Sequence, residues 1–293
     1  MNRFPEAETA AKKIRVLAPD ISNYSIYFLA FVRGDNSEMQ NQLALAKAGK
    51  GYVEAMASAA ADTAAYNGHI ERHSAIHMTS GDNEPVAISQ AKRAALWEAE
   101  FQLDDEARRD ARESLAIAPT LYVRTIAALA LARAKDSVEA ERLIKNLEKT
   151  LPPESMLMLY GGSSIRAALD LNRNDAIDAI KRLQEAAKVE LSTEFWFPGS
   201  MMYPVYIRGV AYLAQHQANE AATEFQKFMD HRGLIANCPL AALAHLQLGR
   251  SYAMSGDLSK ARAAYQDFLT LWKDADPDIP IYKQAKAEYA KLK

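Results

Sequence analysis

The chain has 293 residues, of which 49% are hydrophobic and 25% charged, and its formal net charge is −2. A chain of this composition can bury a large core, so it does not belong to the disordered class. The near-neutral balance provides no concentrated basic surface, so nucleic acid is not an expected partner. The single cysteine, Cys238, excludes an internal disulfide.

The sequence also argues against a membrane span. The first residues, MNRFPEAETAAKK, contain no apolar segment typical of a secretory signal. The longest clean apolar run, 126–132, is far shorter than the roughly 20 residues that a spanning helix needs. We therefore expect a soluble chain, with its compartment left open.

Two segments near the C-terminus, 208–228 and 249–269, match when Gly209 is aligned with Gly249, an offset of 40 residues. Each contains a glycine, a tyrosine three residues later, an alanine nine residues after that, and an aromatic residue four further on. This spacing predicts a helical hairpin of two helices, A and B. The glycine on helix A and the alanine on helix B would let the two helices approach closely, and the aromatic residue would fill the gap to the next hairpin.

The same frame extends to the N-terminus and predicts the elements in chain order. It gives a lone helix B over 1–20, repeats of about 34 residues over 21–153, repeats of about 40 over 154–275, and a capping helix over 276–293. The small position of helix B falls at Ala7, Met39, His73, Ala107, Ala140, Ala179, Ala221 and Ala261, and its helix-A partner at Tyr27, Ala61, Ala95, Ala128, Ala167, Gly209 and Gly249. The frame predicts an all-α solenoid of about seven hairpins.

Proline supports these boundaries, since it cannot continue the hydrogen-bond ladder of a helix. Pro19, Pro85, Pro119 and Pro152 each stand twelve residues after a helix-B small position, where helix B should end. The lone helix B over 1–20 has no helix A before it. We expect it to continue a solenoid of a longer protein; the alternative is that it forms a natural N-terminal cap.

The later repeats contain longer connectors, 191–204 and 231–240, which would either lengthen helices or form loops on one edge. The stretch 194–206, EFWFPGSMMYPVY, is rich in large apolar side chains. It could be an exposed contact patch or could fold back to seal the joint between repeats, and we favour sealing. At the C-terminus, 279–293 reads as a Lys-rich amphipathic cap, the kind of end that solenoids need.

The stretch HIERHSAIH places His69, His73 and His77 four residues apart, as in a metal site. His69 and His77 would lie about 12 Å apart along a helix, so the three cannot share one ion. In the repeat frame His73 occupies the helix-B small position, opposite Ala61 on an alanine-rich helix A. We therefore expect a hairpin packed around imidazoles; a metal site and a pH-sensitive hinge are the lesser alternatives. No metal or cofactor is expected.

The paired segments VYIRGVAYLAQHQANEAATEFQKFMDHRGL and LAHLQLGRSYAMSGDLSKARAAYQDFL resemble tetratricopeptide (TPR) repeats, and more closely the C-terminal TPR region of bacterial eukaryotic-like serine/threonine-protein kinases. The segment 26–46 is similar to the start of that region. The resemblance implies a right-handed superhelix that follows a kinase domain. The chain itself has no kinase motif: Gly233 in DHRG stands where the catalytic aspartate would be. We expect no enzymatic activity from it.

In TPR solenoids the concave groove is lined by helix-A residues that flank the small position. Aromatic and basic side chains of this kind are enriched where proteins bind partners. The predicted set is Tyr24, Phe28, Phe31, Tyr66, Lys92, Tyr122, Arg133, Tyr203, Tyr206 and Arg250. The expected function is recognition of a protein or peptide in this groove. The alternatives are self-association into a homo-oligomer through 191–206, or sensing of a small molecule inside the superhelix.

Overall fold

The computed structural model describes residues 3–48, 53–70, 83–93, 97–191 and 202–292. All regular elements in these ranges are helical, which confirms the all-α class. The first half contains α1 (Phe4–Leu17), α2 (Pro19–Arg33), α3 (Asn36–Lys47), α4 (Val53–Tyr66), α5 (Asn83–Arg93), α6 (Asp104–Ile117), α7 (Leu121–Arg133) and α8 (Ser137–Thr150). The second half contains a π-helical turn, η3 (Leu157–Gly162), and then α9 (Ser163–Asn172), α10 (Ala176–Ala186), α11 (Tyr203–Ala214), α12 (Ala218–Asp230), α13 (Arg232–Ile235), α14 (Pro239–Ser255), α15 (Leu258–Leu271) and α16 (Pro280–Ala290).

The turns inside four hairpins share one local design. The first or second residue after the first helix has a left-handed φ between 60° and 82°, which ends the helical segment: Gly34, Lys135, Asn174 and Gly256. The next residue is an aspartate whose carboxylate accepts a hydrogen bond from the amide three residues later, at 3.0–3.3 Å: Asp35, Asp136, Asp175 and Asp257. This N-cap starts the second helix immediately. The chain therefore reverses direction within two or three residues.

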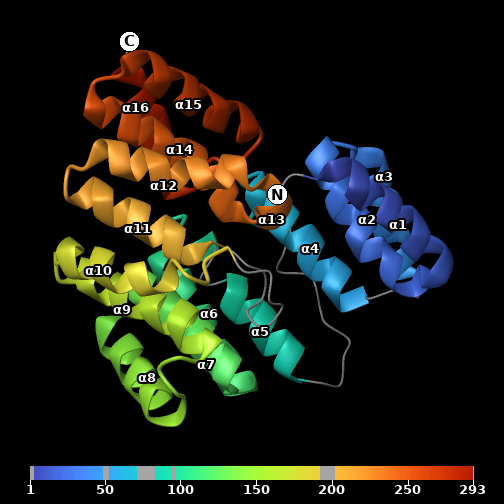
Figure 1. The fold of residues 1–293 in the computed structure, drawn as a ribbon, viewed down its shortest axis with the longest axis horizontal. Helices are drawn as coiled ribbons and strands as arrows, with labels where there is room; N and C mark the ends of the chain where they lie inside the picture. The colour runs from blue at the N-terminus through green and yellow to red at the C-terminus, as the bar shows by residue number, and fades with distance from the viewer. Residues whose placement is uncertain (1–2, 49–52, 71–82, 94–96, 192–201, 293) are drawn as a thin grey trace.

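From α5 to α15 the helices form a curved stack (Figure 1). From α5 to α12 each helix packs against the next one in the chain, and α14 packs against α12 and α15. The first helices of successive hairpins also pack on one another: α5 on α7, α7 on α9, α9 on α11 and α11 on α14. Several of the predicted small positions lie in the described part of this stack. Ala107, Ala128, Ala140, Ala167 and Ala179 are completely buried.

The two glycines of the best-matched segments have a specific steric role. A Cβ atom on Gly209 would lie 2.6 Å from Cζ of Phe225, and one on Gly249 would lie 2.7 Å from Cδ2 of Tyr265. The aromatic residue of helix B therefore packs directly on the glycine of its own hairpin. The ring occupies the space that the missing side chain of the glycine leaves.

The C-terminal part of the chain returns to contact α4. The indole Nε1 of Trp272 donates a hydrogen bond of 2.9 Å to the carbonyl of Tyr66, and the amide of Asp276 donates one of 2.8 Å to the carbonyl of Gly68. Gly68 has a φ of 76°, and a Cβ there would meet Trp272 and Ala275 at 3.1 Å or less. Glycine is thus required both by backbone conformation and by this close approach.

The longer connector 231–240 takes part in the same closure. It forms α13 and then Asn237, whose buried amide donates to the carbonyl of Ala59 at 2.7 Å and to the hydroxyl of Thr63 at 2.9 Å, both on α4. The extra residues of this repeat thus reach a helix that lies more than 170 residues away in sequence. The stack curls on itself, and α4 forms the seam.

The hydrophobic core consists of a large cluster and smaller ones. One large cluster of buried apolar residues runs from α4 through to α16, whereas α2, α3 and α4 share a separate small cluster around Tyr27, Met39 and Met56. Helices α1 to α3 form a group on the right of the view in Figure 1, joined to the rest by α4. None of the described helices combines the length and apolar character needed to cross a membrane.

Candidate functional site

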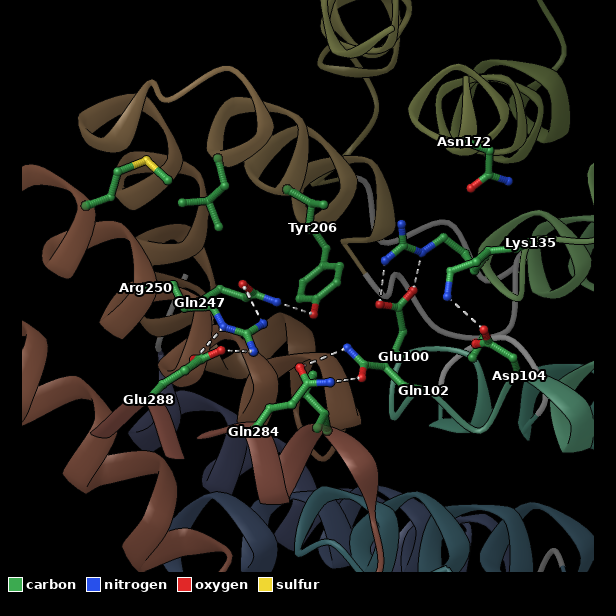
Figure 2. Close-up of a pocket in the computed structure, with 16 residues that line it drawn as sticks. Glu100, Gln102, Asp104, Lys135, Asn172, Tyr206, Gln247, Arg250, Gln284 and Glu288 are labelled. Atoms are coloured by element: carbon green, nitrogen blue, oxygen red, sulfur yellow. Dashed lines mark hydrogen bonds and ion pairs between the residues drawn. The ribbon is translucent and has the colours of Figure 1, made fainter. Parts of the chain in front are cut away.

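A groove of about 590 Å³ lies on the inner side of the curved stack (Figure 2). Its walls come from the first helices of successive hairpins, α7, α9, α11 and α14, and it is closed on one side by α16 and the turn 97–103. The lining residues are Ala99, Glu100, Gln102, Asp104, Arg133, Lys135, Asn172, Tyr206, Val210, Leu213, Gln247, Arg250, Met254, Ile281, Gln284 and Glu288. The residues differ widely in sequence position, so only the curvature of the stack brings them together.

One wall of the groove contains a buried ion pair between Arg133 and Glu100. The guanidinium binds the carboxylate with two hydrogen bonds, Nε to Oε1 at 2.5 Å and Nη2 to Oε2 at 2.8 Å. The hydroxyl of Tyr203 donates to the same Oε1 at 2.6 Å. Burial alone would lower the pKa of Arg133, but the charge and hydrogen bonds of Glu100 raise that pKa above its ordinary value. Burial, and then the charge of Glu100, raise the pKa of Tyr203 well above its ordinary value.

The opposite end of the groove repeats this arrangement with other residues. Arg250 on α14 binds Glu288 on α16 through two hydrogen bonds of 2.9 Å, and the hydroxyl of Tyr265 donates to the same carboxylate at 2.8 Å. Burial opposes the charge of Arg250, whereas Glu288 raises its pKa above the ordinary value. Each of these two glutamates is therefore held by one arginine and one tyrosine.

A third pair, Lys135 with Asp104, lies at the rim with 2.8 Å between Nζ and Oδ2. The lining thus contains three cations and three anions, and each cation contacts one of the anions. The groove has no net charge. Because the partners are already joined, the ionic groups serve mainly to fix the walls.

Four carboxamides supply the uncharged polar part of the lining. Gln102 and Gln284 face one another across the closed side of the groove and exchange hydrogen bonds in both directions (Figure 2). Gln247 donates to the hydroxyl of Tyr206 at 3.1 Å. Asn172 donates to the carbonyl of Ala132 at 2.8 Å and so caps the end of α7.

The ten residues that the sequence predicted for the groove fall into separate places. Arg133, Tyr206 and Arg250 line the groove, and Tyr203 lies behind its wall, bound to Glu100. Tyr122 is in the first turn of α7 and is not a lining residue. The remaining five, on α2, α4 and α5, lie away from the groove: Tyr24, Phe28, Phe31, Tyr66 and Lys92.

The four aromatic residues of this group contact one another in two pairs, whereas Lys92 pairs with an aspartate. Tyr24 meets Phe28 edge-on with 4.7 Å between ring centroids, and Phe31 meets Tyr66 edge-on at 5.0 Å. Lys92 is buried and its ammonium pairs with the carboxylate of Asp62 on α4. The aromatic residues are half-buried: Tyr24, Phe28 and Phe31 pack against the small N-terminal core, and Tyr66 packs against the large one.

Sequence reasoning missed the acidic and amide partners of the groove. Glu100 stands in a turn that the repeat frame places near a helix A, and Gln284 and Glu288 stand on the predicted cap. No sequence pattern around Glu100 indicates its role. For Gln284 and Glu288, the only indication in the sequence is that they lie one helical turn apart on the polar side of the predicted cap.

Two other expectations concern segments that the structure covers only in part. His73 and His77 lie outside the described residues, whereas His69 is described and lies with its Nδ1 3.5 Å from Oδ1 of Asp276. Of the apolar connector, 192–201 is outside the described residues. Met202 and Tyr203 are completely buried, so this end of the connector is part of the core and not an exposed patch.

No family model matches the sequence, and no curated protein matches it. The arrangement of the helices and the chemistry of the groove are thus the observations on which a function can be based.

Proposed function

We propose that this chain is a non-catalytic TPR-type interaction module that binds a peptide or a segment of a partner protein in the groove between α7, α9, α11, α14 and α16. The observation that supports the proposal is the groove itself, built from the first helices of successive hairpins with side chains fixed in place. Rigid side chains lose little conformational freedom on binding, which favours affinity.

The fixed state of the lining is visible in its hydrogen bonds. Arg133 and Arg250 are each held by two bonds to a glutamate, and each glutamate also binds a tyrosine hydroxyl. A ligand therefore meets charged groups that do not need to rearrange. Every charged group of the lining is engaged in an ion pair. None is therefore left to accept or donate a proton, so the lining suits binding more than catalysis.

The wider context is also a proposal. The resemblance of the repeats to the C-terminal region of bacterial serine/threonine-protein kinases supports a role in which partner binding localises a kinase or changes its oligomeric state. The coding sequence upstream of this chain tests that context, because it should encode a kinase domain. An unrelated upstream sequence would contradict the context without affecting the binding proposal.

A blocking substitution tests the groove. Met254 lines the groove and is 42% exposed, and Val138 is 84% exposed and is not a lining residue. Peptides selected from a phage-displayed library on the wild-type chain should bind Met254→Glu at least about tenfold more weakly, as measured by fluorescence anisotropy, a loss of about 1.4 kcal/mol. The same peptides should bind Val138→Glu like wild type. Equal binding to all three proteins would place the site elsewhere.

A small-molecule sensor is the second candidate, and the size of the groove favours it. A volume of about 590 Å³, partly enclosed by α16, lies within the range of small-ligand sites. Thermal-shift screening of metabolites at saturating concentration would reveal such a ligand as a rise in Tm. A rise that Met254→Glu abolishes would favour this candidate over a peptide.

A further inference from the structure

We infer that the groove selects an uncharged ligand rich in amide groups: a short stretch of peptide with uncharged side chains, held by its main chain. The inference rests on the proposed function and specifies the chemistry of its ligand. It follows from two properties of the lining, the internal pairing of its charges and the supply of carboxamides.

The charges argue against an acidic or basic ligand. A ligand carboxylate would have to take Arg133 from Glu100, or Arg250 from Glu288, and leave a glutamate without its partner. A ligand ammonium would displace the arginines in the same way. Breaking an ion pair that is largely buried leaves one charge uncompensated, which is strongly unfavourable. Charge complementarity therefore favours a neutral ligand.

The carboxamides provide what a peptide main chain needs. Gln102, Gln247 and Gln284 each carry an acceptor oxygen and two donor hydrogens, and a peptide group needs one of each. Asn172 contributes its oxygen, because its amide nitrogen already donates to the Ala132 carbonyl and the Ser137 hydroxyl. Gln102 and Gln284 currently satisfy each other across the closed side of the groove (Figure 2). A peptide group placed between the two glutamines would break their contact with each other. It would form one amide–amide contact with Gln102 and another with Gln284.

The remaining lining is apolar and can contact uncharged side chains. Val210 and Leu213 from α11, Met254 from α14 and Ile281 from α16 contribute it. An extended segment would thus find amide partners along the side made by α16 and the turn 97–103, and apolar contacts along α11 and α14. The amide side of the groove would bind the peptide main chain, and the apolar side would accept apolar side chains without selecting one residue type.

Three pooled libraries of N-acetylated, C-amidated pentapeptides test the inference by affinity-selection mass spectrometry on the full chain. One library lacks Asp, Glu, Lys, Arg and His, the second contains acidic residues at fixed positions, and the third contains basic residues there. We expect retention from the uncharged library, with a Kd that changes less than about twofold between about 50 and 500 mM NaCl, because no ligand charge is screened.

Gln284→Leu removes the amide from the groove and keeps a side chain of similar size. Retained peptides should bind it about tenfold more weakly, as expected for loss of one or two hydrogen bonds. Gln184→Leu, the same change at an exposed position of α10, is the matched control and should bind like wild type. Circular dichroism checks that both variants are folded.

The outcomes distinguish failure of the uncharged-ligand inference from failure of the proposed peptide-binding function. Retention only from the acidic or basic library, or a Kd that rises steeply with salt, would overturn the uncharged-ligand inference and leave peptide binding intact. Unchanged binding to Gln284→Leu would overturn it as well. No retention from any of the three libraries would count against the proposed peptide-binding function itself. Salt dependence requires only the wild-type chain, so the test does not depend on a variant.

Discussion

The N-terminal unit, α1 to α3, and the stack from α7 to α15 use the same kind of hairpin but bury it to very different extents. In α7 nine consecutive or nearly consecutive residues are buried, whereas in α1 only Ala11 is buried, and Val16 and Leu17 remain more than 80% exposed. A hairpin inside the stack is covered by neighbours on both sides. The N-terminal unit has one such neighbour, α4.

The difference shows that the stability of a hairpin in this fold comes from its neighbours more than from its own sequence. Repeat proteins follow this rule because each unit contacts only the adjacent ones. Here the closure onto α4 adds long-range contacts that the N-terminal unit does not share. We therefore expect α1 to α3 to open first, and four experiments address the contrast from the largest expected effect to the smallest.

The largest effect should come from Arg208, which lies buried between α10, α11 and α12. Its guanidinium binds Glu190 at 2.8 and 3.0 Å and Glu224 at 2.6 Å. Arg208→Ala would leave two buried carboxylates with only Lys227 nearby, so we expect a loss of about 3–5 kcal/mol in the free energy of unfolding. Urea unfolding followed by tryptophan fluorescence measures it.

The matched control for that variant lies in the N-terminal unit. Arg15 pairs with Glu38 at 2.9 Å, but the arginine side chain is 57% exposed. Arg15→Ala should lower the free energy of unfolding by less than about 1 kcal/mol, since water screens the pair. Equal losses in the two variants would contradict the contrast between the two regions.

Trp272 tests the seam between the C-terminal part and α4. Trp272→Phe keeps an aromatic ring but removes the hydrogen bond to the Tyr66 carbonyl and leaves a small cavity. The expected loss is about 2 kcal/mol. Hydrogen exchange should speed up at the amides of α4 and much less at those of α8, which does not touch the seam. Uniform acceleration across both helices would show that the indole stabilises the whole stack and not the seam.

Gly209 tests the close approach within a hairpin. Gly209→Ala places a Cβ within 2.9 Å of three atoms of the completely buried Phe225 ring, and overpacking should outweigh the gain in helix propensity by about 1–2 kcal/mol. Adding Phe225→Leu should recover part of this loss, so the double variant will be more stable than the sum of the single changes predicts. Strict additivity in thermal unfolding would contradict the steric explanation.

The smallest effect concerns pH and the buried carboxyl group of Glu98. Burial first, and then the negative charge of Asp110, raise its pKa to about 8 in the folded chain, although Arg93 opposes the shift. The folded state therefore binds this proton more tightly than the unfolded state. Stability from this group is complete below about pH 4.5, the unfolded value, and is lost as the pH rises toward 8.

Glu98→Gln keeps a donor beside Asp110 and cannot ionise. Relative to wild type, it should gain about 1 kcal/mol or more of stability between pH 5 and 8. The measurement is urea unfolding at several pH values in one buffer mixture. Glu113→Gln, at an exposed position of the same helix α6 as Asp110, is the control. A pH profile for Glu98→Gln that runs parallel to wild type would contradict the raised pKa.

Much of the local organisation could be predicted from the sequence, because it depends on neighbours in the chain. Small residues at Ala107, Ala140 and Ala179 recur at hairpin spacing, and each is completely buried. The sequence also contains Gly, Lys or Asn followed by Asp at each of the four turns, but the repeat frame did not include this pattern. The groove was predicted in part, through Arg133, Tyr206 and Arg250, because they lie on the inner face of their helices.

By itself, then, the sequence determined an all-α chain, the positions of most hairpins and one face of the groove. Tertiary structure alone decided that the stack curls until Trp272 reaches Tyr66, and that Glu100 and Glu288 neutralise the arginines of the groove. The physical reason is that small rotations add up along the stack, and each rotation is set by the shapes of many contacting side chains. Only the sum of these rotations determines which distant residues meet.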